Sequence, residues 1–286
     1  ESGRNSFHFF EASMQDTVEK RLAVDRRFRS AIHNGEFILH YQPQIDARSG
    51  RITAVEALIR WMDGETGMVS PAKFIPLAEE SGMIIRIGEQ SLHSALRDMK
   101  SWIDNGINPD RIAVNISVQQ FQHINFLKMV VQCLEATGVA PGFLEFEITE
   151  SLLMSNVERT GKVLHSLMEM GISIAIDDFG TGYSSLNYLK NLPVHTLKVD
   201  QSFIRDLGQS PQDGAIVRAI ITMAEALGKN VVAEGVETRE QMDFLLAERC
   251  FQLQGFYFSR HLPIDQLLPE HKHPFPFAAL LKDAQP

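Results

Sequence analysis

The sequence contains only two cysteines among its 286 residues, Cys133 and Cys250, and they lie far apart. A disulfide scaffold is therefore not expected, and both side chains should be ordinary reduced thiols. Cysteine and histidine are nowhere grouped at the spacing of a zinc site. The two histidines of the segment EHKHPF, His271 and His273, are better explained as part of a solvated tail.

Long apolar runs and positive charge are also scarce. The chain has no unbroken apolar run of about 18 residues, which a membrane-spanning helix needs, and its first residues lack the apolar core of a secretory signal. A cytoplasmic location is expected for this segment, although a longer protein containing it could be membrane-anchored. With 27 Lys and Arg against 36 Asp and Glu, the net charge is −9. Because nucleic-acid affinity comes mainly from basic residues, duplex nucleic acid is not an expected partner.

Strand and helix patterns alternate along most of the chain. The pattern of residues 12–34 predicts an amphipathic helix. The segment 36–46 is expected to form a strand whose end Pro43 marks, and residues 51–61 a second strand. Residues 70–106 read as helical and residues 252–258 as the last strand. Roughly eight strands in this length predict an α/β fold, a (β/α)8 TIM-type barrel. The short turn after Asp46 predicts an antiparallel first strand.

Polar side chains stand where the predicted strands end, which is where barrel enzymes place their active sites. A solvated strand end explains any one of them, but it does not easily explain oxygen ligands at five neighbouring strands. Such oxygens select hard cations, and two adjacent aspartates could bridge two ions. A lysine among them could hold the attacking water. The residues are Glu56, Arg60, Asn115, Glu147, Glu150, Asp177, Asp178, Lys198, Glu234 and Gln254.

The glycine-rich loop after Asp178 has a competing interpretation. Gly180 and Gly182 follow a strand and precede a helix, which loosely mimics a dinucleotide-binding fingerprint. The third glycine of that pattern is missing, and the two acids before the loop would repel a pyrophosphate. The metal-site interpretation is therefore favoured.

Several short motifs together give the chain a family resemblance over about residues 35–265. They are YQP at 41–43, EAL at 56–58, FIPLAEESG at 74–82, NIS at 115–117, EITE at 147–150, DDFGTGYSSL at 177–186, LKVD at 197–200, AEGVE at 233–237 and QGF at 254–256. In this combination the sequence closely resembles the EAL-domain family of bacterial cyclic di-GMP phosphodiesterases. The departures Ile59, His195, Arg249 and Phe251 remove none of the proposed ligands.

The resemblance implies hydrolysis of cyclic di-GMP to linear 5′-pGpG with two Mg²⁺ or Mn²⁺ ions. One ion would be held by Glu56, Asn115, Glu147 and Asp177. Asp177 would bridge to the second ion beside Asp178, with Glu234 and Gln254 acting through water. Lys198 would contact the nucleophilic water and Glu234 would be the general base, so that Lys198, Glu234 and Glu56 are the expected catalytic residues. The expected substrate contacts are Gln42, Arg60, Asp178 and Gln254, and Glu150 would brace the loop of residues 178–185.

The resemblance also implies a domain organisation and partners. Residues 1–34 would be a connector helix and the tail of a preceding GGDEF domain, residues 35–268 the barrel, and residues 269–286 a C-terminal tail. A homodimer and fusion to a GGDEF or sensory domain are expected. Two other functions stay open: a catalytically silent cyclic di-GMP receptor, and an unrelated Mg²⁺-dependent barrel lyase.

Overall fold

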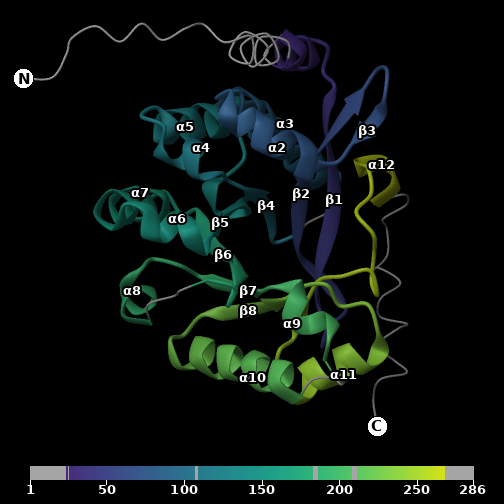
Figure 1. The fold of residues 1–286 in the computed structure, drawn as a ribbon, viewed down its shortest axis with the longest axis vertical. Coiled ribbons are helices and arrows are strands. Elements are labelled where there is room, and N and C mark those ends of the chain that lie inside the picture. The colour runs from purple at the N-terminus through teal and green to yellow at the C-terminus, as the bar shows by residue number, and fades with distance from the viewer. Residues whose placement is uncertain (1–23, 25, 107–108, 183–185, 208–210, 268–286) are drawn as a thin grey trace, which may run out of the picture.

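Strands form the centre of the molecule and helices surround them (Figure 1). The computed structural model describes residues 24, 26–106, 109–182, 186–207 and 211–267. Eight strands close into a ring, and a short ninth strand extends the edge of β2, which confirms the predicted barrel. The strands are β1 (Phe37–Asp46), β2 (Arg51–Asp63), β3 (Gly67–Val69), β4 (Arg111–Asn115), β5 (Leu144–Thr149), β6 (Ser173–Phe179), β7 (Thr196–Val199), β8 (Asn230–Ala233) and β9 (Gln252–Leu253).

Strand β1 is the one member of the ring that runs against its neighbours. It pairs antiparallel with both β2 and β9 and closes the ring between them, whereas β2 and β4 to β9 pair in parallel. The predicted antiparallel first strand is therefore confirmed. The carboxyl ends of the parallel strands meet at one rim, and β1 enters the barrel from that rim.

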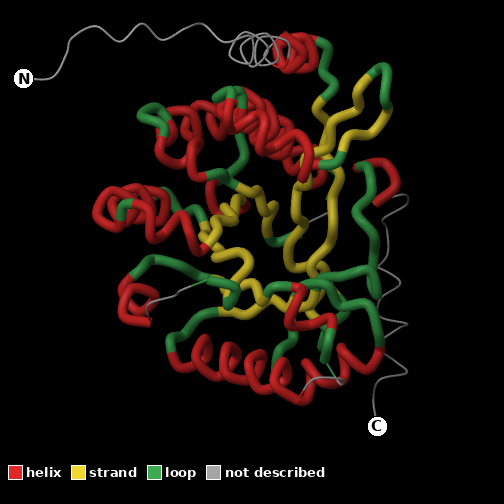
Figure 2. The backbone as a smooth tube through the Cα atoms, in the orientation of Figure 1, coloured by secondary structure: helices red, strands yellow, loops and turns green. Residues whose placement is uncertain are grey.

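Helices cover the outer face of the ring (Figure 2). They include α2 (Pro71–Glu80), α3 (Ile84–Asp104), α4 (Val118–Gln122), α5 (Phe126–Thr137), α6 (Glu150–Ser155), α7 (Val157–Glu169), α8 (Leu186–Asn191), α9 (Gln201–Arg205), α10 (Pro211–Ala226), α11 (Arg239–Ala247) and α12 (Ile264–Leu267). Residues 26–33 are also helical, which agrees with part of the helix expected over 12–34, and residues 12–23 lie outside the described part. Within the described part, no helix is both long and apolar enough to cross a bilayer.

Two apolar clusters hold the barrel together. The larger fills the space between the ring and its helices, with Leu92, Ile112 and Leu144 fully buried. The smaller packs Phe28 against Trp61, with ring centroids 5.4 Å apart, and fixes the N-terminal helix on β1 and β2. Cys133 and Cys250 are free and buried, and burial raises the pKa of Cys133 to about 11.

Some predicted boundaries are wrong, for local reasons. Pro43 does not end β1, which continues to Asp46. The N–H of Tyr41 points away from β2 and donates to the carbonyl of Leu262. Residue 43 lies two positions farther along and would direct an N–H to the same side, where β1 has few partners. The missing N–H of Pro43 therefore costs β1 little. The helix expected over 70–106 breaks where Gly82 takes a φ of +73°.

Other differences concern the short elements. Two separate helices, α4 and α5, follow β4, because His123 adopts an extended conformation after α4. The last strand is only Gln252–Leu253, since the chain turns away at Gly255. The small strand β3 was not predicted.

Candidate active site

A buried lysine forms the centre of the site. Lys198 lies on β7, its side chain is 1% exposed, and its ammonium faces four carboxylates at the carboxyl-end rim. The Nζ atom lies 2.6 Å from Oε1 of Glu234 and 2.7 Å from Oε1 of Glu147. It lies 3.4 Å from Oδ1 of Asp177 and 3.6 Å from Oε2 of Glu56. The structure thus brings together four predicted acids from four different strands or strand ends.

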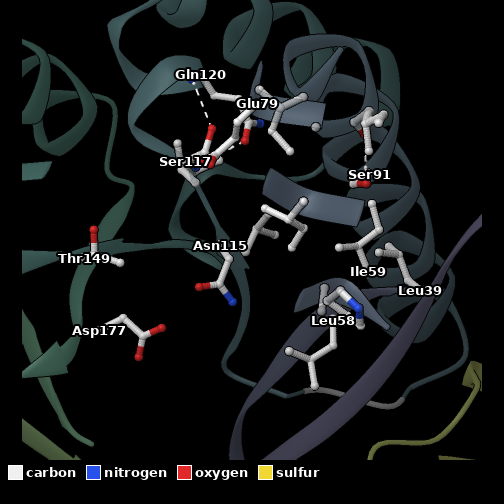
Figure 3. Close-up of a pocket in the computed structure, with 18 of the residues that line it drawn as sticks. Leu39, Leu58, Ile59, Glu79, Ser91, Asn115, Ser117, Gln120, Thr149 and Asp177 are labelled. Carbon is white, nitrogen blue, oxygen red and sulfur yellow. Dashed lines mark hydrogen bonds between the residues drawn. The ribbon is translucent and has the colours of Figure 1, made fainter. Parts of the chain in front are cut away.

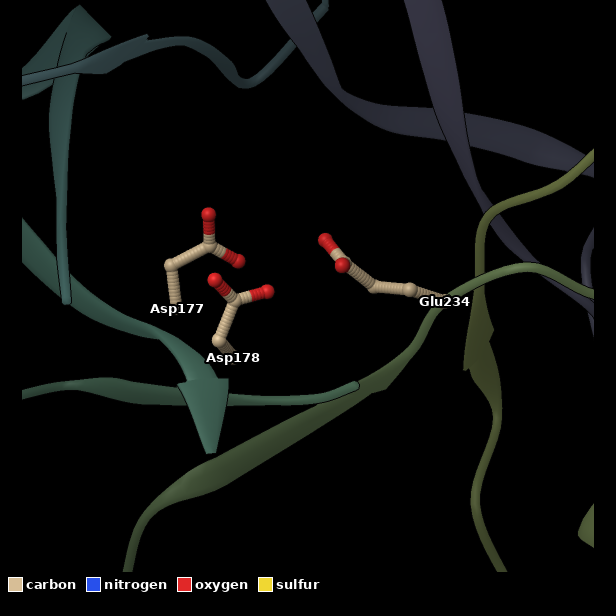
Figure 4. Close-up of side chains that lie close together, drawn as sticks. All are labelled: Asp177, Asp178 and Glu234. Atoms are coloured by element: carbon tan, nitrogen blue, oxygen red, sulfur yellow. The ribbon is translucent and has the colours of Figure 1, made fainter. Parts of the chain in front are cut away.

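A fifth carboxylate completes the acidic group. Asp177 and Asp178 at the end of β6 point toward Glu234 after β8 (Figure 4). One oxygen from each of the three lies within 4.8 Å of the others, a spacing at which they could share a cation. Asp178 has a φ of +53°, which is uncommon for a residue other than glycine. This backbone turn lets two consecutive side chains face the same space, whereas successive strand residues normally face opposite sides.

The negative charge of the acidic group exceeds what the single ammonium of Lys198 can neutralise. Burial raises the pKa of Glu234 to about 8, although Lys198 opposes this, and burial with the charge of Asp177 raises the pKa of Asp178 to about 6. Burial and the neighbouring Glu56 hold the pKa of Glu147 well above its usual value. Lys198 in turn has a raised pKa, because the four carboxylates outweigh the effect of its own burial.

The amides around Glu56 are oriented by that carboxylate. Asn115 Nδ2 donates to Glu56 Oε1 at 2.7 Å, and Gln254 Nε2 donates to Glu56 Oε2 at 2.6 Å. Gln254 Nε2 also donates to Gln42 Oε1 at 3.1 Å. These bonds help to hold the pKa of Glu56 below its usual value, against its burial and together with the charge of Lys198.

The donor set fits a hard divalent cation. Oε2 of Glu147 and Oε1 of Gln254 are buried and have no hydrogen-bond partner in the described part of the chain. A buried acceptor without a partner is costly, and a cation would supply one. Carboxylate and amide oxygens without thiolates suit Mg²⁺ or Mn²⁺.

Two pockets flank the acidic group and share Leu58 and Asp177. The first has a volume of about 340 Å³ and is lined mostly by apolar side chains, with Asn115 and Ser117 opposite Leu58 and Leu39 (Figure 3). The second has a volume of about 200 Å³ and is more polar. Of the predicted substrate contacts, Arg60 and Asp178 line the first pocket, whereas Gln42 and Gln254 line the second.

Glu150 lies apart from the acidic group, at the first position of α6, and is buried. It packs against the glycine-rich loop: a Cβ added to Gly182 would lie 2.8 Å from Oε1 of Glu150. Residues 183–185 of the loop that Glu150 is expected to brace lie outside the described residues.

The sequence interpretation missed three polar residues that the structure brings to this region. Gln44 Nε2 donates to Glu147 Oε1 at 3.4 Å. The His40 ring lies 5.7 Å from the ring of His261, which lines the second pocket. The signal for the first two was the polar residue at every second position of β1, where His40, Gln42 and Gln44 face the same side. Nothing local in the sequence indicated His261.

Comparison with known proteins identifies the family. The sequence model of the EAL domain matches residues 25–261. The chain is 42% identical to the bifunctional diguanylate cyclase/cyclic di-GMP phosphodiesterase MucR of Pseudomonas aeruginosa over 94% of this chain and 39% of MucR. It is 38% identical to the cyclic di-GMP phosphodiesterase PdeR of Escherichia coli over 92% of this chain and 40% of PdeR. The chain therefore spans less than half the length of these relatives.

The fold agrees with this assignment. A structure of the PaMucR phosphodiesterase in complex with c-di-GMP superposes with a TM-score of 0.83 at 43% identity, covering 86% of this chain and all of that one. The chain belongs to the EAL domain family.

Proposed function

We propose that this chain is a metal-dependent phosphodiesterase that hydrolyses one phosphodiester of cyclic di-GMP to linear 5′-pGpG. The observation that carries the proposal is the buried Lys198, surrounded by carboxylates at the rim of the barrel and flanked by two pockets. A ligand with two nucleobases and two phosphodiesters suits a site with two pockets on either side of one charged centre. The names of MucR and PdeR support the same activity.

Two divalent ions, Mg²⁺ or Mn²⁺, would be held by residues at the carboxyl-end rim. Glu56, Asn115, Glu147 and Asp177 would hold the first, and Asp177 and Asp178 the second, with Glu234 and Gln254 reaching them through water. Bound there, the ions would lower the pKa of the attacking water and offset the negative charge on phosphorus-bound oxygens.

The protein groups would handle the water and its proton. The water oxygen bonds to phosphorus as the bond from phosphorus to the 3′ oxygen breaks. The 3′ oxygen takes up a proton from solvent, so that a new 5′-phosphate end and a free 3′ hydroxyl result. Glu234 is suited to accept the proton of the water, because its carboxylate already bonds to Lys198 and projects into the second pocket. Lys198 would orient the water, while Gln42 and Arg60 would hold the substrate.

The test is direct. The purified chain is incubated with cyclic di-GMP and Mg²⁺, and formation of the linear dinucleotide is followed. Turnover that stops with EDTA supports the proposal. Binding without turnover would instead favour the silent receptor, and neither binding nor turnover would favour an unrelated barrel enzyme.

We also propose that Glu150 braces the loop of residues 178–185 and that this loop lies toward a homodimer interface. Its support is that the buried carboxylate of Glu150 lies against Gly182 of this loop. Glu150→Ala is expected to fold normally, lose most turnover and dimerise more weakly. Turnover and sedimentation are measured side by side for this variant and the parent, and parental values of both would show that Glu150 is no brace.

We also propose that the chain is divided into a connector, a barrel and a tail. Residues 1–34 would connect a preceding GGDEF or sensory domain to the barrel of residues 35–268, with a tail at 269–286. The greater length of MucR and PdeR supports such an arrangement.

A further inference from the structure

The polar side chains of β1 extend outward from the acidic group along the hairpin of β1 and β2. On β1, side chains at every second position face one side, so His40 faces the same side as Gln42 and Gln44. In the hairpin register Gln42 lies opposite Glu56, and His40 lies opposite Leu58. His40 is therefore one step, roughly 7 Å, farther out from the acidic group than Gln42.

A second histidine reaches this place from the other end of the chain. The segment after β9 forms a bridge to β1, in which Tyr41 and Leu262 exchange backbone hydrogen bonds of 2.7 and 2.9 Å. The bridge brings the ring of His261 to 5.7 Å from the ring of His40, and His261 lines the second pocket. The Nδ1 atoms of both rings are buried and have no hydrogen-bond partner within the described part of the chain.

A buried cation completes the group. Arg60 is 8% exposed and donates to the carbonyl of Ile59 at 2.8 Å, and among the described residues it forms no ion pair. A guanidinium kept from water without an anionic partner is costly, and it leaves donors for a ligand. In the hairpin register Arg60 lies opposite Ile38, one alternate position beyond the pair of His40 and Leu58, so Arg60 and His40 are diagonal neighbours on one face. Arg60 lines the first pocket and His261 the second. A guanidinium near imidazoles with free nitrogens suits an anion better than a metal ion.

The groups around the two rings set their protonation state. Burial and the charge of Arg60 lower the pKa of both histidines. The nearby His261 ring lowers the pKa of His40 further, and Arg260 lowers the pKa of His261 further. The backbone at His261 opposes these shifts weakly. Glu56, Glu234 and Glu237 line the same pocket as His261. Without a ligand the imidazoles are thus neutral near pH 7, and an anion bound against them would favour the protonated form.

We propose that His40, His261 and Arg60 form a proton-linked anion subsite, which holds the phosphodiester of the cyclic dinucleotide that is not being cleaved. The two imidazoles, those of His40 and His261, together take up a proton as the ligand binds. This inference rests on the proposed function for the identity of the ligand. His40 and His261 are then specificity-determining residues that act on binding and not on the bond-breaking step.

The test separates binding from chemistry. KM and kcat are measured between pH 5.5 and 8.5 for the parent, for His261→Gln and for His40→Gln. If binding raises the pKa of one imidazole by about one unit, the KM of the parent rises up to about tenfold over this range. In the glutamine variants, KM should be higher at low pH and lose most of that dependence, with kcat unchanged. His93→Gln, which changes an exposed histidine on α3, is the matched control.

A calorimetric measurement keeps the inference independent of turnover. Cyclic di-GMP is titrated at pH 7 in Ca²⁺, in two buffers of different ionisation heat, so that proton uptake is measured even if the parent is inactive. Uptake in the parent that is lost in His261→Gln supports the subsite. Equal uptake in both proteins, or none in the parent, overturns it. Guanosine causing the same uptake as cyclic di-GMP would overturn the assignment to a phosphodiester.

Discussion

Replacing Lys198 with methionine removes the ammonium from the centre of the acidic group while keeping a side chain of similar length. Lys198 is 1% exposed and contacts four carboxylates between 2.6 and 3.6 Å. Removing one partner of a buried ion pair costs about 3–5 kcal/mol, because the remaining charges stay uncompensated. At roughly 2–4 °C per kcal/mol for a domain of about this size, the Tm of Lys198→Met in EDTA at pH 8.5 should fall by roughly 6–20 °C.

The loss should depend on pH and on metal. Burial raises the pKa of Glu234 to about 8, so this carboxyl binds its proton more tightly in the folded than in the unfolded protein. Its contribution to stability is complete below the ordinary carboxyl pKa and is lost as the pH rises through about 8. The gap between Lys198→Met and the parent should therefore be smaller at pH 6 than at pH 8.5. Mg²⁺ at 100 times its Kd would restore about 2.7 kcal/mol.

Thermal unfolding followed by circular dichroism is the assay, with Lys162→Met as the control. Lys162 is an exposed lysine on α7 whose Nζ lies 2.7 Å from Oε1 of Glu158, and such an exposed pair contributes little to stability. If Lys198→Met in EDTA at pH 8.5 melts no lower than Lys162→Met, Lys198 is not the counter-charge that the geometry indicates.

Three further outcomes are expected. Glu56→Ala should abolish hydrolysis, because it removes a proposed metal ligand that also orients Asn115 and Gln254, and parental turnover would contradict the metal assignment. Mg²⁺ or Mn²⁺ should support turnover and Ca²⁺ suppress it, since Ca²⁺ prefers longer bonds and more ligands; equal rates would count against a tight two-ion site. Arg249→Gly should raise the free energy of unfolding by about 0.5–1 kcal/mol, because Arg249, which follows the C-cap residue of α11, has a φ of +64°; a lower urea midpoint would refute this.

The barrel and its acidic rim could be predicted because both depend on short segments of the sequence. Each apolar strand and the polar residue at its end are adjacent, and the parallel arrangement then brings those ends together. Lys198, Glu147 and Asp177 come from three different strands, and they meet as the barrel interpretation requires. The lengths of the elements were less predictable, because single backbone angles such as that at Gly82 decide where a helix stops.

The histidine pair could not be predicted, since it depends on a tertiary contact. His40 and His261 lie at opposite ends of the barrel sequence and meet through the bridge between Tyr41 and Leu262. That bridge follows a strand much shorter than the one expected, and no local pattern at His261 marks it as part of the site. Gln44 was missed for a different reason: the predicted end of β1 at Pro43 placed it outside the strand.

The antiparallel first strand is what gives this rim its polar wall. Parallel strands offer a barrel site mainly the residues near their carboxyl ends. Strand β1 instead enters at the rim and descends, so its alternate residues line the site over its whole length. His40 lies farthest out, Gln42 contacts Gln254, and Gln44 reaches Glu147 deep in the centre. One strand thereby links the proposed outer anion subsite to the inner carboxylates, so that a ligand with two phosphodiesters would reach both.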